Sequence, residues 1–161
     1  MSYQKRVRNL RYKPFYKQWL LDNGVEVYLD YVPTSTLSCD SLQKYWNDYV
    51  YCKIVQNGKE RKPCPNTKNH PKGMIGECTY YQISLSRKGQ TSIGIPLHRI
   101  IYVWFYGVIE PYNENNEKME ICHNQRFTDV WLDNHISNLR LDTAKANRAE
   151  RKGAKNQYWK K

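Results

Sequence analysis

The side chains best suited to chemistry lie near the end of the chain, where one of its four histidines is followed by several asparagines. His123 ends the short apolar segment Glu120-Ile-Cys-His, and Asn138 and Asn147 come after it. Imidazole can exchange a proton near neutral pH because its ordinary pKa lies close to 7. A lone histidine is more often an ordinary surface or core residue, but the ordered asparagines favour a small site built around His123.

The elements that must position these residues follow from local patterns. Residues 119–123 are predicted to form a strand, 124–138 a loop, 139–142 a second strand and 143–152 a helix, with Thr143 or Asp142 as its N-cap. If that helix packs across the two strands, His123 and Asn147 approach the same point. The two sequence stretches are therefore interpreted as halves of one site.

The preceding segment predicts a β-hairpin followed by a helix. Apolar residues alternate over 81–85 and 93–97, on either side of the polar turn 87–90. An apolar stripe with helical spacing follows, and its members are Leu97, Ile100, Ile101, Trp104 and Phe105. Gly107 is expected to end this helix. This helix is expected to be the central core element, with His98 in a structural role at its start.

The N-terminal part of the chain is less regular. Residues 13–23 predict a short helix with Pro14 in its first turn, and 25–29 alternate as a half-buried strand. Residues 40–53 are ambiguous between helix and strand, and Asn57-Gly58 indicates a hairpin turn. The stretch 59–76 is rich in Pro, Asn, Lys and Gly, which predicts a loop.

Several motifs occur together in the C-terminal half. They are Leu97-His-Arg-Ile-Ile101, Cys122-His123, Asp133-Asn134-His135, Asn138-Leu-Arg-Leu-Asp-Thr143 and Asn147-Arg148. In these motifs the chain resembles the HNH endonuclease family, particularly its phage and intron-homing branch, over roughly residues 78–152. The resemblance implies an α+β fold in which a β-hairpin and a helix precede a ββα-metal (HNH, His-Me finger) unit, with an N-terminal α/β extension.

The same resemblance divides the chain and assigns roles to its residues. Residues 1–77 would be a basic arm and an extension of unknown role, 78–152 the nuclease domain and 153–161 a basic tail. His123 aligns with the general base, and Asn138 with the central asparagine that holds the loop and the histidine orientation. Asn147 aligns with a ligand of Mg²⁺ or Mn²⁺, a metal ion that would bind the scissile phosphate and stabilise the leaving 3′ oxygen.

One position departs from the family pattern. The residue before the histidine is often Asp, but here it is Cys122, and a thiolate is a poor partner for Mg²⁺. The second metal ligand therefore stays open among Cys122, Asp133, His135 and Glu120. We rank His135 and Asp133 above Glu120, because the loop can bring the first two inward.

The net charge of +11 lies at the two ends of the chain. Residues 1–17 carry six Lys or Arg and no acid, and 140–161 carry eight basic and two acidic residues, with aromatic residues among them. Basic groups release counterions from polyphosphates, and rings stack on bases. The expected partner is double-stranded DNA, with neither a membrane nor a protein partner implied. The DNA-binding candidates are Arg6, Arg8, Arg11, Arg140, Lys145, Arg148, Arg151 and Lys152.

The cysteines and the N-terminus predict a cytoplasmic, intracellular protein, and the resemblance implies a phage or a mobile element as its source. Five cysteines without a CxxC pair fit a reducing compartment, and the first residues lack a secretory signal. A structural zinc ion on Cys64, His70 and Cys78, with Cys39 or Cys52, is a weaker alternative because the spacings match no common finger.

The sequence thus predicts a metal-dependent HNH endonuclease that hydrolyses DNA phosphodiester bonds. One ββα unit supplies one base and one metal, so a monomer is expected to nick a single strand per event. Two alternatives remain: a DNA-binding protein that keeps the scaffold without catalysis, which Cys122 favours, and a zinc-stabilised regulatory module.

Overall fold

The computed structural model describes residues 13–29, 52–65, 81–124 and 134–150, which form an α+β fold around one central helix. Its strands are β1 (Phe15–Tyr16), β2 (Val25–Leu29), β3 (Cys52–Gln56), β4 (Lys59–Arg61), β5 (Cys64–Pro65), β6 (Tyr81–Arg87), β7 (Gln90–Pro96), β8 (Val108–Ile109), β9 (Met119–His123) and β10 (Leu139–Thr143). Its helices are α2 (Lys17–Asp22), α4 (Leu97–Tyr106), the 3-10 turn η2 (Ile136–Asn138) and a final helix over 144–150.

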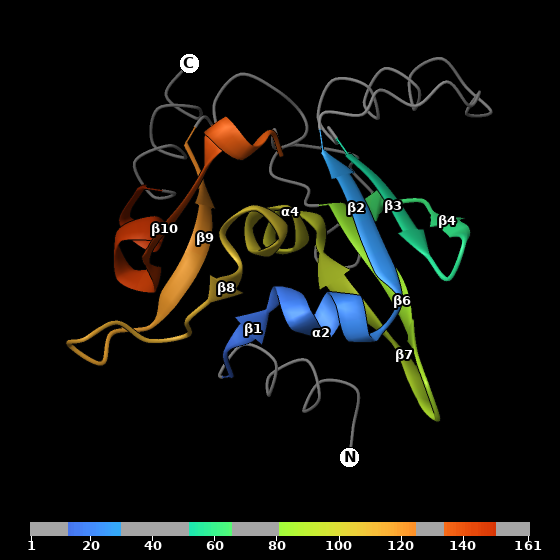
Figure 1. The fold of residues 1–161 in the computed structure, drawn as a ribbon. Helices are drawn as coiled ribbons and strands as arrows, with labels where there is room; N and C mark the ends of the chain where they lie inside the picture. The colour runs from blue at the N-terminus through green and yellow to red at the C-terminus, as the bar shows by residue number, and fades with distance from the viewer. Residues whose placement is uncertain (1–12, 30–51, 66–80, 125–133, 151–161) are drawn as a thin grey trace, which may run out of the picture.

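The described strands make four small antiparallel sheets around α4. Their orders are β2-β3-β4, β5-β6-β7, β1-β8 and β10-β9. In Figure 1 the two three-stranded sheets lie on one side of α4, while β9, β10 and the helix 144–150 lie on the other. The core cluster takes residues from both sides of α4, including Leu20 and Ile54 with Ile83 and Leu139. Packing therefore continues across the expected boundary between residues 77 and 78, a boundary that itself lies outside the described residues.

Helix α4 forms where the apolar stripe predicts it. Leu97, Ile100 and Ile101 are buried, and Gly107 ends the helix in the left-handed conformation (φ 91°). The expected stripe is wrong at its last position, since Phe105 is 56% exposed and Val103 is buried instead. Phe105 is the eighth residue after Leu97 and lies at the margin of a 3.6-residue stripe, so its face turns outward.

Gly107 provides a test of this helix end. A Cβ at this position would meet no atom within 4 Å, so Gly107→Ala adds only the backbone strain of a positive φ. We expect the substitution to lower the free energy of unfolding by about 1–2 kcal/mol in urea denaturation. Gly107→Asn should lose less, because asparagine tolerates the left-handed region. Equal stability of Gly107→Ala and the native chain would contradict this account.

The N-terminal helix begins later than its sequence predicts. Residues 15 and 16 pair with β8 instead, in the register Phe15 with Ile109 and Tyr16 with Val108. The backbone N–H of Lys17 then donates to the carbonyl of Gly107 at 2.9 Å. This long-range pairing takes up the residues that local pattern places in the first turn, and the helix still ends at the predicted Asn23-Gly24 turn.

The other short strands also correct the sequence interpretation. The predicted loop over 59–76 contains β4 and β5, because β3 and β6 offer edges to which three and two residues can pair. The turn at Asn57-Gly58 is confirmed, with φ of 51° and 79°, as are the strand 25–29 and the 81–96 hairpin. Most of the ambiguous stretch 40–53 lies outside the described residues, and its last two residues start β3.

None of the described helices is long and apolar enough to cross a membrane.

Candidate functional site

Strands β9 and β10 place the candidate residues on two opposite faces. They pair antiparallel over five positions, from His123 with Leu139 to Met119 with Thr143. Successive side chains of a strand point to opposite faces. One face carries His123 and Ile121 toward α4, where Ile121 joins the core cluster. The other face carries Cys122 and Glu120 toward the helix 144–150, where Glu120 meets Asn147. His123 and Asn147 therefore lie on opposite faces of β9 and do not approach the same point, contrary to the expectation from the sequence.

His123 is held from two sides. Its Nε2 lies 3.0 Å from Oδ1 of Asn134, and its ring meets the ring of His98 edge-on at 4.9 Å. A carboxamide oxygen only accepts, so with Oδ1 of Asn134 toward the ring the donor of this bond is Nε2–H, the tautomer whose lone pair lies on Nδ1. Both partners are buried, and the imidazole itself is 0% exposed. The ring is therefore held in one orientation.

The main chain of Asn138 links the end of β9 to the start of β10. Its carbonyl accepts from the N–H of Asn124 at 2.8 Å, and its own N–H donates to the carbonyl of His135 at 2.8 Å. These bonds join the residue after His123 to the start of β10. Asn138 thus ties the two strands together at this end.

The opposite face brings Asn147 and Glu120 together. The helix 144–150 begins after Thr143, whose Oγ1 accepts from the N–H of Ala146 at 3.1 Å and so acts as the N-cap. Asn147 lies one turn into this helix, is 5% exposed and donates from Nδ2 to Oε2 of Glu120 at 2.8 Å. The carboxylate orients the amide.

The remaining candidate ligands lie in different settings. Cys122 is buried on the Glu120 side of β9, and its Sγ lies 3.7 Å from the carbonyl of Glu120. His135 caps η2, since its Nδ1 lies 2.7 Å from Oγ of Ser137 and accepts from the N–H of Ser137. Asp133 lies outside the described residues. Glu120, ranked below His135 and Asp133 from the sequence, contacts Asn147.

The donor set on this face suits a hard cation better than a soft one. Carboxylate and amide oxygens are ligands that Mg²⁺ accepts, and Mg²⁺ keeps several waters or phosphate oxygens besides one or two protein ligands. Glu120 and Asn147 supply one oxygen-bearing group each. Within the described residues no three His, Cys, Asp or Glu side chains gather as a metal site. A hard cation bound here would therefore have to take most of its coordination from water or phosphate oxygens.

The zinc alternative finds no support in its one described side chain. Cys52 is a free thiol packed in the apolar core, and burial raises the pKa of that thiol. A buried apolar setting disfavours the thiolate that binds zinc. Of the other proposed ligands, Cys39, His70 and Cys78 lie outside the described residues.

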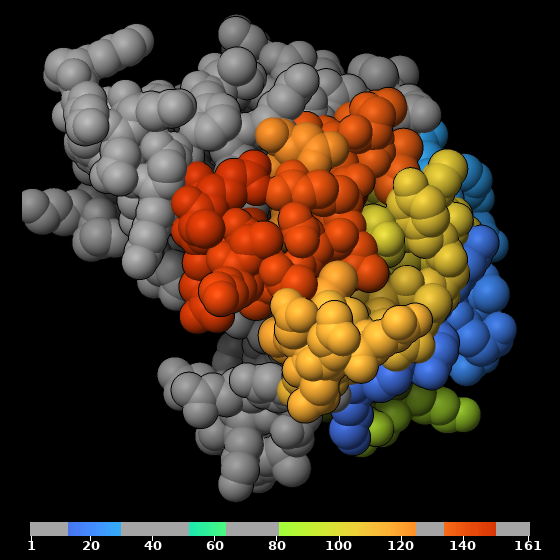
Figure 2. Space-filling model, turned by 90° about the vertical axis from the view of Figure 1, so that its left-hand side faces the viewer, coloured from blue at the N-terminus to red at the C-terminus, as the bar shows by residue number. Residues whose placement is uncertain are grey.

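Of the described DNA-binding candidates, one makes hydrogen bonds within the protein and two are exposed to solvent. Arg140 bonds to Asn124, Asp142 and Glu150. Burial lowers the pKa of Arg140, but the hydrogen bond and charge of Glu150 raise it overall, so the guanidinium stays charged. Lys145 and Arg148 are exposed on the helix 144–150, which together with β9 and β10 forms the middle of the face in Figure 2. The candidates Arg6, Arg8, Arg11, Arg151 and Lys152 lie outside the described residues.

Sequence reasoning missed the contact of Asn134 with His123 and the contact of Glu120 with Asn147. The signal for Asn134 was its place in Asp133-Asn134-His135, a motif noted without a contact assigned to it. The signal for Glu120 was the period of two along β9, which puts residue 120 on the same face as Cys122.

Comparison with protein-family models, with curated proteins and with solved structures finds no match.

Proposed function

We propose that the chain is a metal-dependent endonuclease of the HNH type, which hydrolyses DNA phosphodiester bonds and nicks one strand per event. The observation that carries the proposal is the arrangement along β9. His123 is held by Asn134 on one face, and Glu120 and Asn147 meet on the other, at the next helix. An imidazole at the end of β9, with a pair of hard oxygen donors on the opposite face of the same strand, provides the groups that metal-assisted hydrolysis needs, and the proposal requires that both faces meet the DNA at this strand end.

His123 is the general base in this proposal. Its Nδ1 accepts a proton from the attacking water, and the charge that forms on the ring is stabilised by the Asn134 oxygen bonded to Nε2. Because the imidazole is fully buried, we expect the DNA-bound chain to differ locally from the free chain so that water reaches Nδ1. Apo geometry often tightens or rearranges in the substrate complex.

Glu120 and Asn147 would hold the metal, with the amide oxygen of Asn147 and a carboxylate oxygen of Glu120 as protein ligands. A bound Mg²⁺ supplies charge stabilisation to the leaving 3′ oxygen. The bond from Asn147 Nδ2 to Glu120 leaves the amide oxygen of Asn147 as the ligand atom. Lys145 and Arg148, exposed on the same helix, provide contacts to the DNA backbone.

The test is conversion of supercoiled plasmid to the open-circular form with Mg²⁺ or Mn²⁺. We expect nicking that requires the metal and stops in EDTA. Binding of DNA without cleavage under either divalent ion would instead favour a non-catalytic DNA-binding protein. The full burial of both Cys122 and His123 is the observation on the side of that second function.

The ligand assignment gives a prediction of its own. Glu120→Gln keeps the size of the side chain and an acceptor for Asn147, but removes the charge. We expect the Mg²⁺ concentration for half-maximal nicking to rise by about 10- to 100-fold, the range found when groups around a metal are changed. His135→Gln, which changes the η2 cap, should leave this concentration within about twofold of the native value. The reverse ranking of the two variants would transfer the ligand role to His135.

A further inference from the structure

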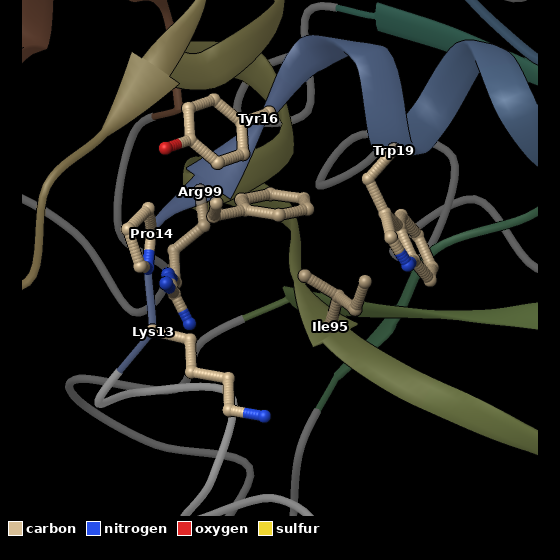
Figure 3. Close-up of a pocket in the computed structure, with 7 residues that line it drawn as sticks. Lys13, Pro14, Tyr16, Trp19, Ile95 and Arg99 are labelled. Atoms are coloured by element: carbon tan, nitrogen blue, oxygen red, sulfur yellow. The ribbon is translucent and has the colours of Figure 1, made fainter.

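A pocket of about 250 Å³ opens where β1, α2, β7 and α4 meet. Phe15, Trp19, Ile95 and Pro14 make its apolar surface, and Lys13 and Arg99 contribute cations. Figure 3 shows Lys13 and Arg99 on one side of the pocket and Trp19 and Ile95 across from them. None of the described residues that line it is acidic.

The lining groups have the geometry of a stacking platform flanked by positive charge. The Phe15 and Trp19 rings lie 6.0 Å apart at 60°, so they form two walls at an angle. The Arg99 guanidinium carbon lies 5.5 Å from the Phe15 ring centroid. Pockets for drug-sized ligands span about 300–1,000 Å³, so this pocket suits a smaller, flat ring system.

We propose that this pocket binds one unpaired nucleobase of a DNA strand, with Lys13 and Arg99 on the phosphates beside it. A base has a flat apolar face that can stack on the partly buried Trp19 ring while its edge meets Phe15 at the inner wall, and its strand carries the negative charge that the two cations complement. Lys13 also follows directly on the basic N-terminal segment of Arg6, Arg8 and Arg11. Charge complementarity therefore favours a nucleic acid over a neutral or basic partner.

The pocket is joined to the His123 region through α4. His98 of this helix contacts the His123 ring, and the next residue, Arg99, lines the pocket. A strand with one base in the pocket would thus be held by the helix that also packs against His123. The binding inference does not require that His123 performs catalysis.

The test compares two oligonucleotides of about 12 nucleotides by fluorescence anisotropy in EDTA, where metal-dependent cleavage is absent. One is single-stranded oligothymidine, and the other has the same backbone built of abasic sugars. We expect the native chain to bind oligothymidine at least about tenfold more tightly than the abasic strand. In Trp19→Leu this ratio should fall toward one, because the substitution removes the ring and keeps an apolar side chain.

Matched controls separate the pocket from general effects. Trp104→Leu changes another partly buried tryptophan that does not line the pocket, and it should keep the native ratio. The double variant Lys13→Gln, Arg99→Gln should weaken the binding of both oligonucleotides equally. It should also lower the slope of log affinity against log salt concentration by about 1.4, as expected for two phosphate contacts on a single strand. Lys59→Gln, an exposed charge on β4, should leave that slope unchanged.

Two results would overturn the inference. One is the same base-dependent ratio in Trp19→Leu and in Trp104→Leu, with melting curves showing that both variants are folded. The other is an unchanged salt slope in the Lys13→Gln, Arg99→Gln variant. His123→Ala should keep the ratio while losing any nicking activity. Failure of the nuclease proposal and failure of the pocket proposal are thus distinguishable.

Discussion

His123→Ala should reduce the rate of plasmid nicking by about 10²- to 10⁴-fold, the contribution of a positioned general base. The imidazole is the proton acceptor in the proposed reaction, and its bond to Asn134 places the basic lone pair on Nδ1. Alanine has no group that accepts a proton. The measurement is the initial rate of open-circle formation at saturating Mg²⁺ and saturating plasmid, so that a change in DNA affinity does not contribute.

Because His123 is fully buried, alanine also leaves a cavity, and a second variant controls for it. His123→Gln retains most of the volume and a polar atom for Asn134, yet it cannot act as a base near neutral pH. Both variants should lose activity alike while the melting temperature of His123→Gln stays closer to the native value. Nicking at the native rate in either variant would remove His123 from the mechanism.

Gln56→Ala should lower the free energy of unfolding by about 2–4 kcal/mol, measured by urea denaturation. The Gln56 side chain is 1% exposed and makes three hydrogen bonds to main-chain atoms. Nε2 donates to the carbonyls of Asn23 (3.0 Å) and Ser86 (2.8 Å), and Oε1 accepts from the N–H of Ser86 (2.9 Å). The β6–β7 ladder shifts register between Leu85 and Arg87. Gln56 thus supplies the partners that this irregularity takes from Ser86.

Gln56→Leu separates hydrogen bonding from volume. Leucine fills nearly the same space but leaves the main-chain groups of Ser86 without Gln56, so most of the loss should persist. Gln18→Ala is the matched control, since Gln18 makes its hydrogen bond to Asp22 at the surface and should change stability by less than about 0.5 kcal/mol. Full stability of Gln56→Leu would show that only the volume of this side chain matters.

The parts of the fold that follow local periodicity were predictable from the sequence. The 81–96 hairpin, α4 with its Gly107 end, and the β9 and β10 strands each carry their signal within a few residues. Elements that depend on a distant partner were not predictable. β1 needs β8 some ninety residues away in order to pair, and β5 needs the edge of β6. A two-residue strand has no periodicity of its own, so local pattern cannot distinguish it from a loop or a helix start.

The candidate site was likewise only partly predictable from the sequence. His123 and Asn147 could be chosen from their residue types and spacing. The partner of each depends on strand register and helix packing, which place Asn134 at the imidazole and Glu120 at the amide. The period of two along β3 places Gln56 on the buried face with Cys52 and Ile54. Its hydrogen-bond partner, the main chain of Ser86, has no sequence signal because it depends on the irregularity in β6.

The pairing of β9 with β10 has a consequence for sequence change in this region. Five residue pairs set which side chains meet α4 and which meet the helix 144–150. A slip of one residue, as a single deletion within β9 would cause, exchanges the two faces completely. The imidazole would then point away from Asn134, and Glu120 would face the apolar core. Changes of length outside the two strands do not have this effect, but β9 itself tolerates insertions and deletions only in pairs.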